Sequence, residues 1–496
     1  MQRLLILCPQ GGPPQAEFDA SIAGAIQAWG GGAVSVSVVC LRQVDAQAVR
    51  RLAPAVRVVD SFEDYRDRNP ALDIKAEALR LAREYPAANW WSIAIAERHF
   101  VDSSFLLGGA GERPQTQDHV EALIVSMVRH FEAVFAAERV SAVMSPVADS
   151  LIIHVFYQVA RRFRVRVLAM SPNAWIREDG KPGFYIGRDE FMHCDRLEDN
   201  YRRLVKRGLL DAERERVRRY KRSVTEFNIA QVYHAMMKRP FVATALSPNL
   251  KRLWAYLREN AARRPEVEYY KVDVAAKTKA NLLRVWRRLR SRSMLGPATL
   301  DIPAHSVFYP MQYQPEQTTL VGGLFFANQI SVIENIAKAL PFGFTLIVKE
   351  HPRGRGARPA WQYRHLARFP NIRFCDANAK EIMARCCAVI TITSTAGLEA
   401  MAMDKPVVAL GRCYYDFADV VYKPQSWYEL AEMLQRILID GEYDENAQRS
   451  DLIDCFFLAY LLARIPALLD KESAAAVAEA VCAELGVGHE PLVQTG

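Results

Sequence analysis

Long apolar runs are absent from the sequence. None of its 496 residues lies in a stretch approaching the ~20 apolar residues that span a bilayer. The apolar run at residues 4–8 is short and is followed at once by glycines and prolines, which is untypical of a signal peptide. We therefore expect a cytoplasmic protein.

Motifs for metals and dinucleotides are also lacking. The nine cysteines are scattered and form no C-x-x-C pair, so neither a zinc site nor a disulfide framework is expected. No Asp-x-Asp pair follows a predicted strand, and the glycines at 11 and 12 lack the G-x-G-x-x-G spacing. The prediction is a protein that uses no metal and no other cofactor.

Positive charge is concentrated in one segment. Residues 201–300 carry 25 Lys and Arg against 8 Asp and Glu, a net charge of +17, whereas the whole chain carries +8. Three interpretations compete: a solvated helical surface, a contact with a membrane surface or an anionic acceptor, and a nucleic-acid surface. No nucleic-acid motif supports the third, so no nucleic-acid partner is expected.

Strands and helices alternate in two separate parts of the chain. Each short apolar run is followed by an amphipathic helix, which is typical of a doubly wound, mostly parallel α/β sheet. Strands are predicted near 4–8, 34–41, 56–59, 140–144 and 165–170, and again at 306–309, 345–349, 372–374, 388–393 and 405–411.

The predicted fold is α/β, with two Rossmann-like domains that face each other across a cleft. Four segments are predicted: an N-terminal domain at 1–196, a basic helical linker or insertion at 197–303, a C-terminal domain at 304–425, and helices at 426–496. Ligands of such sheets bind at the carboxyl ends of the strands, so the residues that follow the strands are the candidates for a site.

Hydroxyl residues follow the strand predicted at 388–393. Ser394 and Thr395 fit the start of a helix that also contains Gly397 and Glu399. The N–H groups and the dipole of a helix start attract phosphate, and the hydroxyls add donors. A simple helix cap is the alternative.

A histidine follows the strand predicted at 345–349. Pro352 ends this strand and holds His351 at the sheet edge, where an imidazole can donate to a phosphate or act as an acid or base. Arg353 and Arg355 lie just beyond and are further phosphate donors. A purely structural histidine is the alternative.

Two further loops carry carboxylates. Gln314 and Glu316 follow the strand at 306–309; Gln314 suits a base or a sugar hydroxyl, and Glu316 is either a catalytic carboxylate or a solvated loop residue. Asp149 follows the strand at 140–144 and is either a helix cap or an acceptor-side carboxylate.

Residues 305–415 resemble the C-terminal half of a GT-B glycosyltransferase, and more closely the bacterial capsule polysaccharide synthesis family, which includes β-Kdo transferases. The motifs that carry the resemblance are Gln314-Pro315-Glu316, Val348-Lys349-Glu350-His351-Pro352, Pro370-Asn371-Ile372, Thr393-Ser394-Thr395-Ala396-Gly397-Leu398-Glu399-Ala400 and Lys405-Pro406-Val407.

The resemblance implies a nucleotide-activated sugar in the cleft between the domains. In related transferases that use CMP-sugars, the His-Pro pair and the Ser-Thr helix start hold the phosphate, and an acidic residue similar to Glu399 holds the ribose. The predicted nucleotide-binding residues are Gln314, His351, Pro352, Arg353, Ser394, Thr395, Gly397 and Glu399, and the predicted catalytic residues are Glu316, His351 and Asp149.

The predicted function is a metal-independent transferase that moves a sugar from a nucleotide donor, preferably CMP-Kdo-like, to a surface-polysaccharide or lipid-linked acceptor. Contact of residues 201–300 with the inner membrane would make the protein peripheral. The alternatives are a UDP-sugar transferase, an epimerase, a polyol-phosphate transferase, or a non-catalytic polysaccharide-assembly protein of the same fold.

Overall fold

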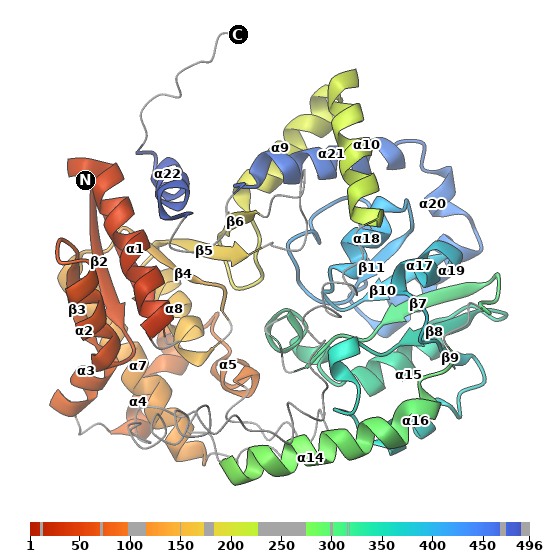
Figure 1. Ribbon diagram of the computed structural model, residues 1–496, viewed down its shortest axis with the longest axis horizontal. Helices are drawn as coiled ribbons and strands as arrows, with labels where there is room; N and C mark the ends of the chain where they lie inside the picture. Colours follow the sequence, from red (N-terminus) through yellow and green to blue (C-terminus); the bar gives the residue numbers. More distant parts are fainter. Residues whose placement is uncertain are drawn as a thin grey trace. The chain divides into compact units, whose positions relative to one another are not determined.

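The computed structural model describes two compact units (Figure 1). The first contains the described residues up to 195 together with 463–487, and the second contains those from 196 to 462. The described residues are 1–9, 13–69, 73–97, 116–148, 150–172, 183–226, 274–297, 301–314, 316, 318–466 and 473–487.

The first unit is built on a six-stranded sheet in the order β3-β2-β1-β4-β5-β6. All neighbouring strands are parallel except β5 and β6. This order is doubly wound, as the sequence predicts, but the antiparallel edge strand β6 was not predicted. The strands are β1 (Gln2–Cys8), β2 (Val34–Cys40), β3 (Arg57–Ser61), β4 (Ala142–Pro146), β5 (Arg166–Pro172) and β6 (Phe184–Gly187).

Helices flank this sheet, and the longest is almost continuously buried on one side. The helices are α1 (Pro13–Gly30), α2 (Gln43–Leu52), α3 (Phe62–Arg68), α4 (Ile74–Glu84), α5 (Trp90–Ala96), α7 (Gln117–Glu138), α8 (Leu151–Arg162) and α22 (Ala474–Glu484). Side-chain caps fix several of their starts: Ser61, Asp73 and Thr116 each accept an N–H of the first helical turn.

The end of the chain returns to the first unit. Helix α22 packs beside α1 (Figure 1), and Val477, Val481 and Cys482 lie in the same core cluster as β1 and β2. Residues Phe184 and Ile465 exchange backbone hydrogen bonds of 3.0 and 2.8 Å. The helices expected together at 426–496 are therefore divided between the units, because only α22 has its apolar face against α1.

The second unit contains a six-stranded sheet in the order β12-β11-β10-β7-β8-β9, parallel throughout. Its central strands are almost completely buried, which explains their unbroken apolar runs. The strands are β7 (Ser306–Pro310), β8 (Thr345–Lys349), β9 (Ile372–Phe374), β10 (Ala388–Thr391), β11 (Val407–Ala409) and β12 (Val421–Tyr422).

Short capped helices connect these strands. Asn328, Asn378 and Ser426 cap the helices that follow them. The helices are α15 (Gln329–Ala339), α16 (Ala360–Leu366), α17 (Ala379–Arg385), α18 (Ala396–Ala402), α19 (Trp427–Leu438), α20 (Glu442–Glu445) and α21 (Arg449–Ala463). The fold is thus α/β, with two Rossmann-like sheets and additional helices.

The basic segment supplies three described helices, α9 (Asp195–Arg207), α10 (Asp211–Glu226) and α14 (Val274–Ser291). Tyr201 of α9 packs edge-on against Phe417 and Phe456, and α10 packs against α18. These helices belong to the second unit rather than forming a separate linker. No helix among the described residues has the length and apolar character needed to cross a membrane.

Candidate functional site

The carboxyl ends of three neighbouring strands carry most of the predicted site. Strand β7 lies between β10 and β8, so the loop after β7 lies between the loops that follow the other two. Met311 extends this pairing, because its N–H donates to the Lys349 carbonyl at 2.9 Å. Ser394 and His351 therefore lie on opposite sides of the β7 loop.

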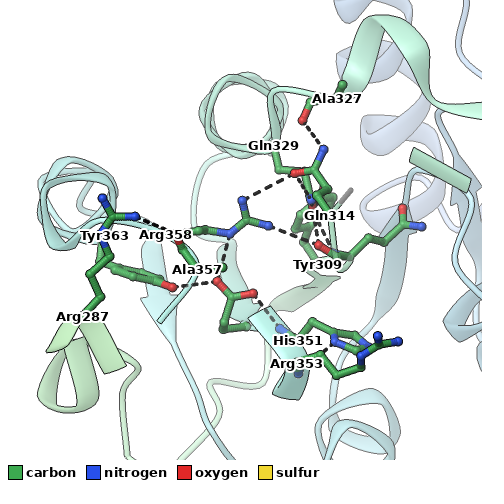
Figure 2. Close-up of polar contacts among 12 residues, drawn as sticks. Arg287, Tyr309, Gln314, Ala327, Gln329, His351, Arg353, Ala357, Arg358 and Tyr363 are labelled. Atoms are coloured by element: carbon green, nitrogen blue, oxygen red, sulfur yellow. Dashed lines mark hydrogen bonds and ion pairs between the residues drawn. The ribbon is translucent and has the colours of Figure 1, made fainter. Parts of the chain in front are cut away.

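A buried ion pair supports this edge of the sheet (Figure 2). The Arg358 Nε donates to Glu350 Oε2 at 2.9 Å, and both residues are 2% exposed. The Tyr363 hydroxyl donates to the same carboxylate oxygen at 2.7 Å, while Oε1 accepts the His351 N–H at 2.8 Å. Glu350 therefore positions the backbone of the predicted phosphate-binding histidine.

Gln314 belongs to this buried network. Its Oε1 accepts from Gln329 at 2.9 Å, and its Nε2 donates to the Ala327 carbonyl at 2.7 Å (Figure 2). The side chain is 1% exposed. Both ends of the amide are therefore occupied within the protein, and this geometry favours a supporting role over the predicted contact with a base or sugar.

Gln312 ties the β7 loop to the loop after β10. Its Nε2 donates to Thr393 Oγ1 at 3.1 Å, and its Oε1 accepts the Thr393 N–H at 3.1 Å. Thr393 Oγ1 then donates to the Thr318 carbonyl at 2.7 Å. A two-point clamp of this kind fixes the residue that precedes Ser394.

His351 is a neutral hydrogen-bond donor in this arrangement. Its Nδ1 accepts the Arg353 N–H at 3.1 Å, so the neutral ring carries its proton on Nε2. Burial lowers the pKa of His351 to about 4, with Glu350 opposing the shift and Arg353 adding to it. The imidazole is thus uncharged near neutral pH, when no ligand is bound, and can donate through Nε2.

Tyr313, Arg353 and Glu316 extend the site beside this histidine. The Arg353 guanidinium lies 4.5 Å from the centre of the Tyr313 ring, which is itself 5.9 Å from the His351 ring. Arg353 Nη1 is 3.5 Å from Glu316 Oε1, and both side chains are nearly half exposed. A cation and a carboxylate are therefore held together at the surface next to the donor histidine.

The loop after β10 presents hydroxyl groups. Ser394 Oγ accepts the Ala396 N–H at 3.2 Å, and the Ser394 carbonyl accepts from the Tyr415 hydroxyl at 2.5 Å. Thr395 is the cap residue of α18, but its side chain makes no capping hydrogen bond. Because α18 has only seven residues, the hydroxyls offer a phosphate more than the helix dipole does.

Gly397 and Glu399 have different roles in the structure. A Cβ on Gly397 would lie 2.5 Å from the Tyr415 hydroxyl, so this glycine permits close packing. Burial raises the pKa of Glu399 to about 7, and Lys380 of α17 opposes the shift. Lys380 itself is held by the carbonyls of Val224 and Thr225 at the end of α10.

The predicted acceptor-side residue Asp149 lies outside the described residues, as do residues 10–12. Helix α8 begins at Leu151, whose N–H donates to Glu97 Oε2 at 2.8 Å. Glu97 is 2% exposed and was not identified in the sequence. Its position at the end of α5, far from α8 in the sequence, gave no local signal.

Histidine, cysteine, aspartate and glutamate do not gather into a candidate metal centre anywhere in the described parts of the chain. All nine cysteines are described, and none forms a disulfide.

Sequence analysis did not assign a role to the polar residues that organise the site, which are Arg358, Glu350, Gln312, Gln329 and Tyr363. One signal was available for Glu350, because it is a charged residue directly after the buried strand at 345–349.

Comparison with known proteins places the site within a matched region. Residues 304–430 match the family described as capsule polysaccharide biosynthesis protein. The resemblance to the capsule polysaccharide synthesis family is therefore confirmed for this part of the chain.

Two curated relatives share part of the sequence. The chain is 27% identical over 191 residues to protein FixF of Sinorhizobium fredii, covering 32% of this chain and 45% of that protein. It is 28% identical over 98 residues to the capsule polysaccharide modification protein LipB of Neisseria meningitidis, covering 18% of this chain and 23% of LipB. The matches thus span less than half of either relative.

The comparison with solved structures finds two kinds of enzyme. The KpsC β-Kdo 2,7 transferase of Thermosulfurimonas dismutans has a TM-score of 0.30 and 12% identity, covering 61% of this chain and 78% of that one. The UDP-GlcNAc 2-epimerase of Neisseria meningitidis, bound to UDP-GlcNAc, has a TM-score of 0.25 and 11% identity, covering 93% and 98%.

Replacing Arg358 by methionine should strongly destabilise the second unit. The change leaves the Glu350 carboxylate buried without its cation, which costs about 3–5 kcal/mol of unfolding free energy. Urea unfolding followed by circular dichroism measures the loss. Arg364→Met, at an exposed position of α16, is the matched control and should change stability by less than about 0.5 kcal/mol. Equal stability of the two variants would contradict the role given to the ion pair.

Proposed function

We propose that this protein transfers a sugar from a nucleotide donor, preferably CMP-Kdo-like, to a hydroxyl of a surface polysaccharide or a lipid-linked acceptor. The observation that carries the proposal is the placement of a neutral donor histidine, His351, on one side of the β7 loop and of the Ser394 and Thr395 hydroxyls on the other. The match of residues 304–430 to capsule polysaccharide biosynthesis proteins supports a role in surface-polysaccharide synthesis.

The phosphate of the donor would bind between the two loops. His351 Nε2 and the hydroxyls of Ser394 and Thr395 donate to its oxygens, and Arg353 supplies positive charge. The phosphate gains charge as the bond to the sugar breaks, so donors fixed in advance stabilise the transition state more than the ground state. The buried ion pair Glu350–Arg358 reduces the movement needed, because Glu350 fixes the His351 N–H.

Glu316 is the proposed acceptor-side base. During transfer, the bond between the anomeric carbon and the phosphate oxygen breaks, and its electron pair leaves with the nucleotide. The acceptor oxygen forms the new bond to the anomeric carbon, and its proton passes to the Glu316 carboxylate. Arg353, 3.5 Å away, keeps this carboxylate near the site in the absence of acceptor. Asp149 is the competing candidate for the same role.

Glu399 is proposed to bind the ribose. An ionised carboxylate accepts hydrogen bonds from two ribose hydroxyls, whereas a protonated one accepts fewer. The pKa near 7 therefore makes this contact sensitive to pH. Pro352 and Gly397 act by shape, the first by starting the short 3-10 turn Pro352–Gly354 directly after His351 and the second by admitting Tyr415.

A UDP-sugar transferase is the second candidate. The residue expected to read the base, Gln314, is buried with both ends of its amide occupied. The proposed CMP-sugar donor therefore rests on the resemblance of the His-Pro and Ser-Thr motifs. Comparing the binding of CMP and UDP decides between cytosine and uracil as the base of the donor.

Nucleotide binding tests the phosphate site directly. CMP should raise the thermal stability of the protein, by an amount equivalent to about 2.7 kcal/mol at a hundredfold excess over its dissociation constant. His351→Asn retains an acceptor for the Arg353 N–H but loses the Nε2 donor, so it should remove most of the shift. His365→Asn on α16 is the control. A shift with UDP in place of CMP would change the proposed donor, and no shift with CMP, CDP, UDP, GDP or ADP would contradict the nucleotide site.

The affinity for CMP should depend on the ionisation of Glu399. Because its pKa is raised to about 7, the carboxyl is protonated below that pH, and affinity should rise between about pH 6 and about pH 8. Without ligand the sign reverses: the fold favours the protonated carboxyl, so stability falls as pH rises from 4.5 towards about 7. In Glu399→Gln, calorimetric titration with CMP should show no rise in affinity between about pH 6 and about pH 8, and thermal unfolding without ligand should show no fall in stability from this group. If the variant kept the pH dependence of the wild type, Glu399 would be excluded from the site.

Glu316→Gln separates catalysis from binding. The variant should bind CMP as the wild type does but lose turnover, by about 100-fold or more, because the base is absent. Release of CMP from CMP-Kdo, with a capsular oligosaccharide as acceptor, is the readout, and addition of EDTA should leave it unchanged since we propose no metal. Full turnover in the variant would transfer the role to Asp149, and nucleotide binding without any turnover in wild type would favour an assembly protein.

A further inference from the structure

The outer face of α14 exposes large apolar side chains. Leu282, Trp286 and Leu289 are 48%, 54% and 73% exposed. Their spacing of four and then three residues places them on one face of the helix. Isolated exposed apolar residues are ordinary, but three on one face of one helix form an exposed apolar patch, and such patches mark interaction sites.

The opposite side of α14 is anchored to the second unit. Arg287 Nη1 donates to the Ala357 carbonyl at 3.1 Å, a contact drawn in Figure 2. Gly356 lies against the Arg284 carbonyl and Arg288, where a Cβ would come within 2.4 Å of that carbonyl. The helix also packs on α16. The exposed face is therefore held in a fixed direction on its own unit.

Charge distinguishes α14 from the other basic helices. Residues 274–297 contain seven Lys and Arg and no Asp or Glu. On α9 and α10, by contrast, Arg207 pairs with Glu213, Arg214 with Asp451, and Lys221 with Asp404 and Asp454. Much of the positive charge of residues 201–226 is thus compensated within the fold. Helix α14, by its sequence, carries only cations.

Arg290 adds a cation to the apolar face. Its guanidinium lies 5.2 Å from the centre of the Trp286 ring, and the side chain is exposed. A tryptophan prefers the headgroup level of a bilayer, and an arginine beside it can lie along the apolar surface while its charge reaches the phosphates. Arg287 and Arg288, which the sequence grouped with Arg290, are turned partly into the protein.

We propose that Leu282, Trp286, Leu289 and Arg290 form a surface that docks on an anionic lipid bilayer. The helix would lie in the plane of the interface, with Leu282 and Leu289 among the acyl chains, Trp286 at the headgroup level and Arg290 at the headgroup phosphates. This contact brings the second unit to a membrane surface whatever sugar it transfers. It does not depend on the proposed donor or acceptor.

Vesicle co-sedimentation of the full chain tests the proposal without nucleotide. Vesicles of phosphatidylcholine mixed with phosphatidylglycerol should bind the wild-type protein, and vesicles of phosphatidylcholine alone should bind it much less. The triple variant L282S/W286S/L289S should bind about tenfold more weakly or worse. Arg290→Gln should lose about fivefold, the effect of one basic residue near an anionic surface. Trp29→Ser is the matched control, since Trp29 of α1 is 47% exposed.

Three results would overturn the proposal. They are equal binding by the triple variant and the wild type, equal binding to both kinds of vesicle, and absence of binding to either. The competing explanation is that this surface binds a second copy of the chain, and light scattering tests it. A dimeric wild type, a monomeric triple variant and no vesicle binding would together support that explanation. The three positions are exposed, so the variant should keep the wild-type unfolding temperature.

Discussion

The ion pair between Glu350 and Arg358 is the constraint on which the candidate site depends. Neither charge is exposed to water, so each needs the other, and their remaining hydrogen-bonding groups are taken by Tyr363, by the Gln312 carbonyl and by the His351 N–H. Breaking one contact leaves a buried charge unsatisfied, which is why such networks are rigid when complete. The rigidity is transmitted outward: Glu350 holds His351, and Gln312 holds the residue before Ser394.

The residues of the β7 loop divide between buried and partly exposed positions. Gln312 and Gln314 point into the network, while Tyr313 and Glu316 remain partly exposed beside Arg353. The same few residues thus supply both the buried support and the groups available to a substrate. A sequence motif of this kind combines structural and chemical roles, so its match to a family of capsule polysaccharide biosynthesis proteins does not assign each residue to one of them.

The strands could be predicted from the sequence because parallel strands buried on both faces leave apolar runs, as in Val389 and Ile390. The position of His351, Glu316 and Ser394 at one edge followed from the rule that such sheets bind ligands at their carboxyl ends. The burial of Gln314 could not be predicted, because it depends on Gln329 and Arg358, which approach only after folding. The same holds for α22, whose apolar residues resemble any terminal helix until α1 is seen beside it.

The return of α22 to the first unit has a consequence for synthesis on the ribosome. The second unit is complete once residue 462 has emerged, whereas the face of α1 that α22 covers stays exposed to water until residues 474–484 follow. Domains generally fold as they emerge, in order from the N-terminus. Here the first unit is synthesised first but completes its core last, because α22 is the final helix to be made. A nascent chain that stalls before residue 474 therefore exposes the apolar face of α1 to chaperones and proteases.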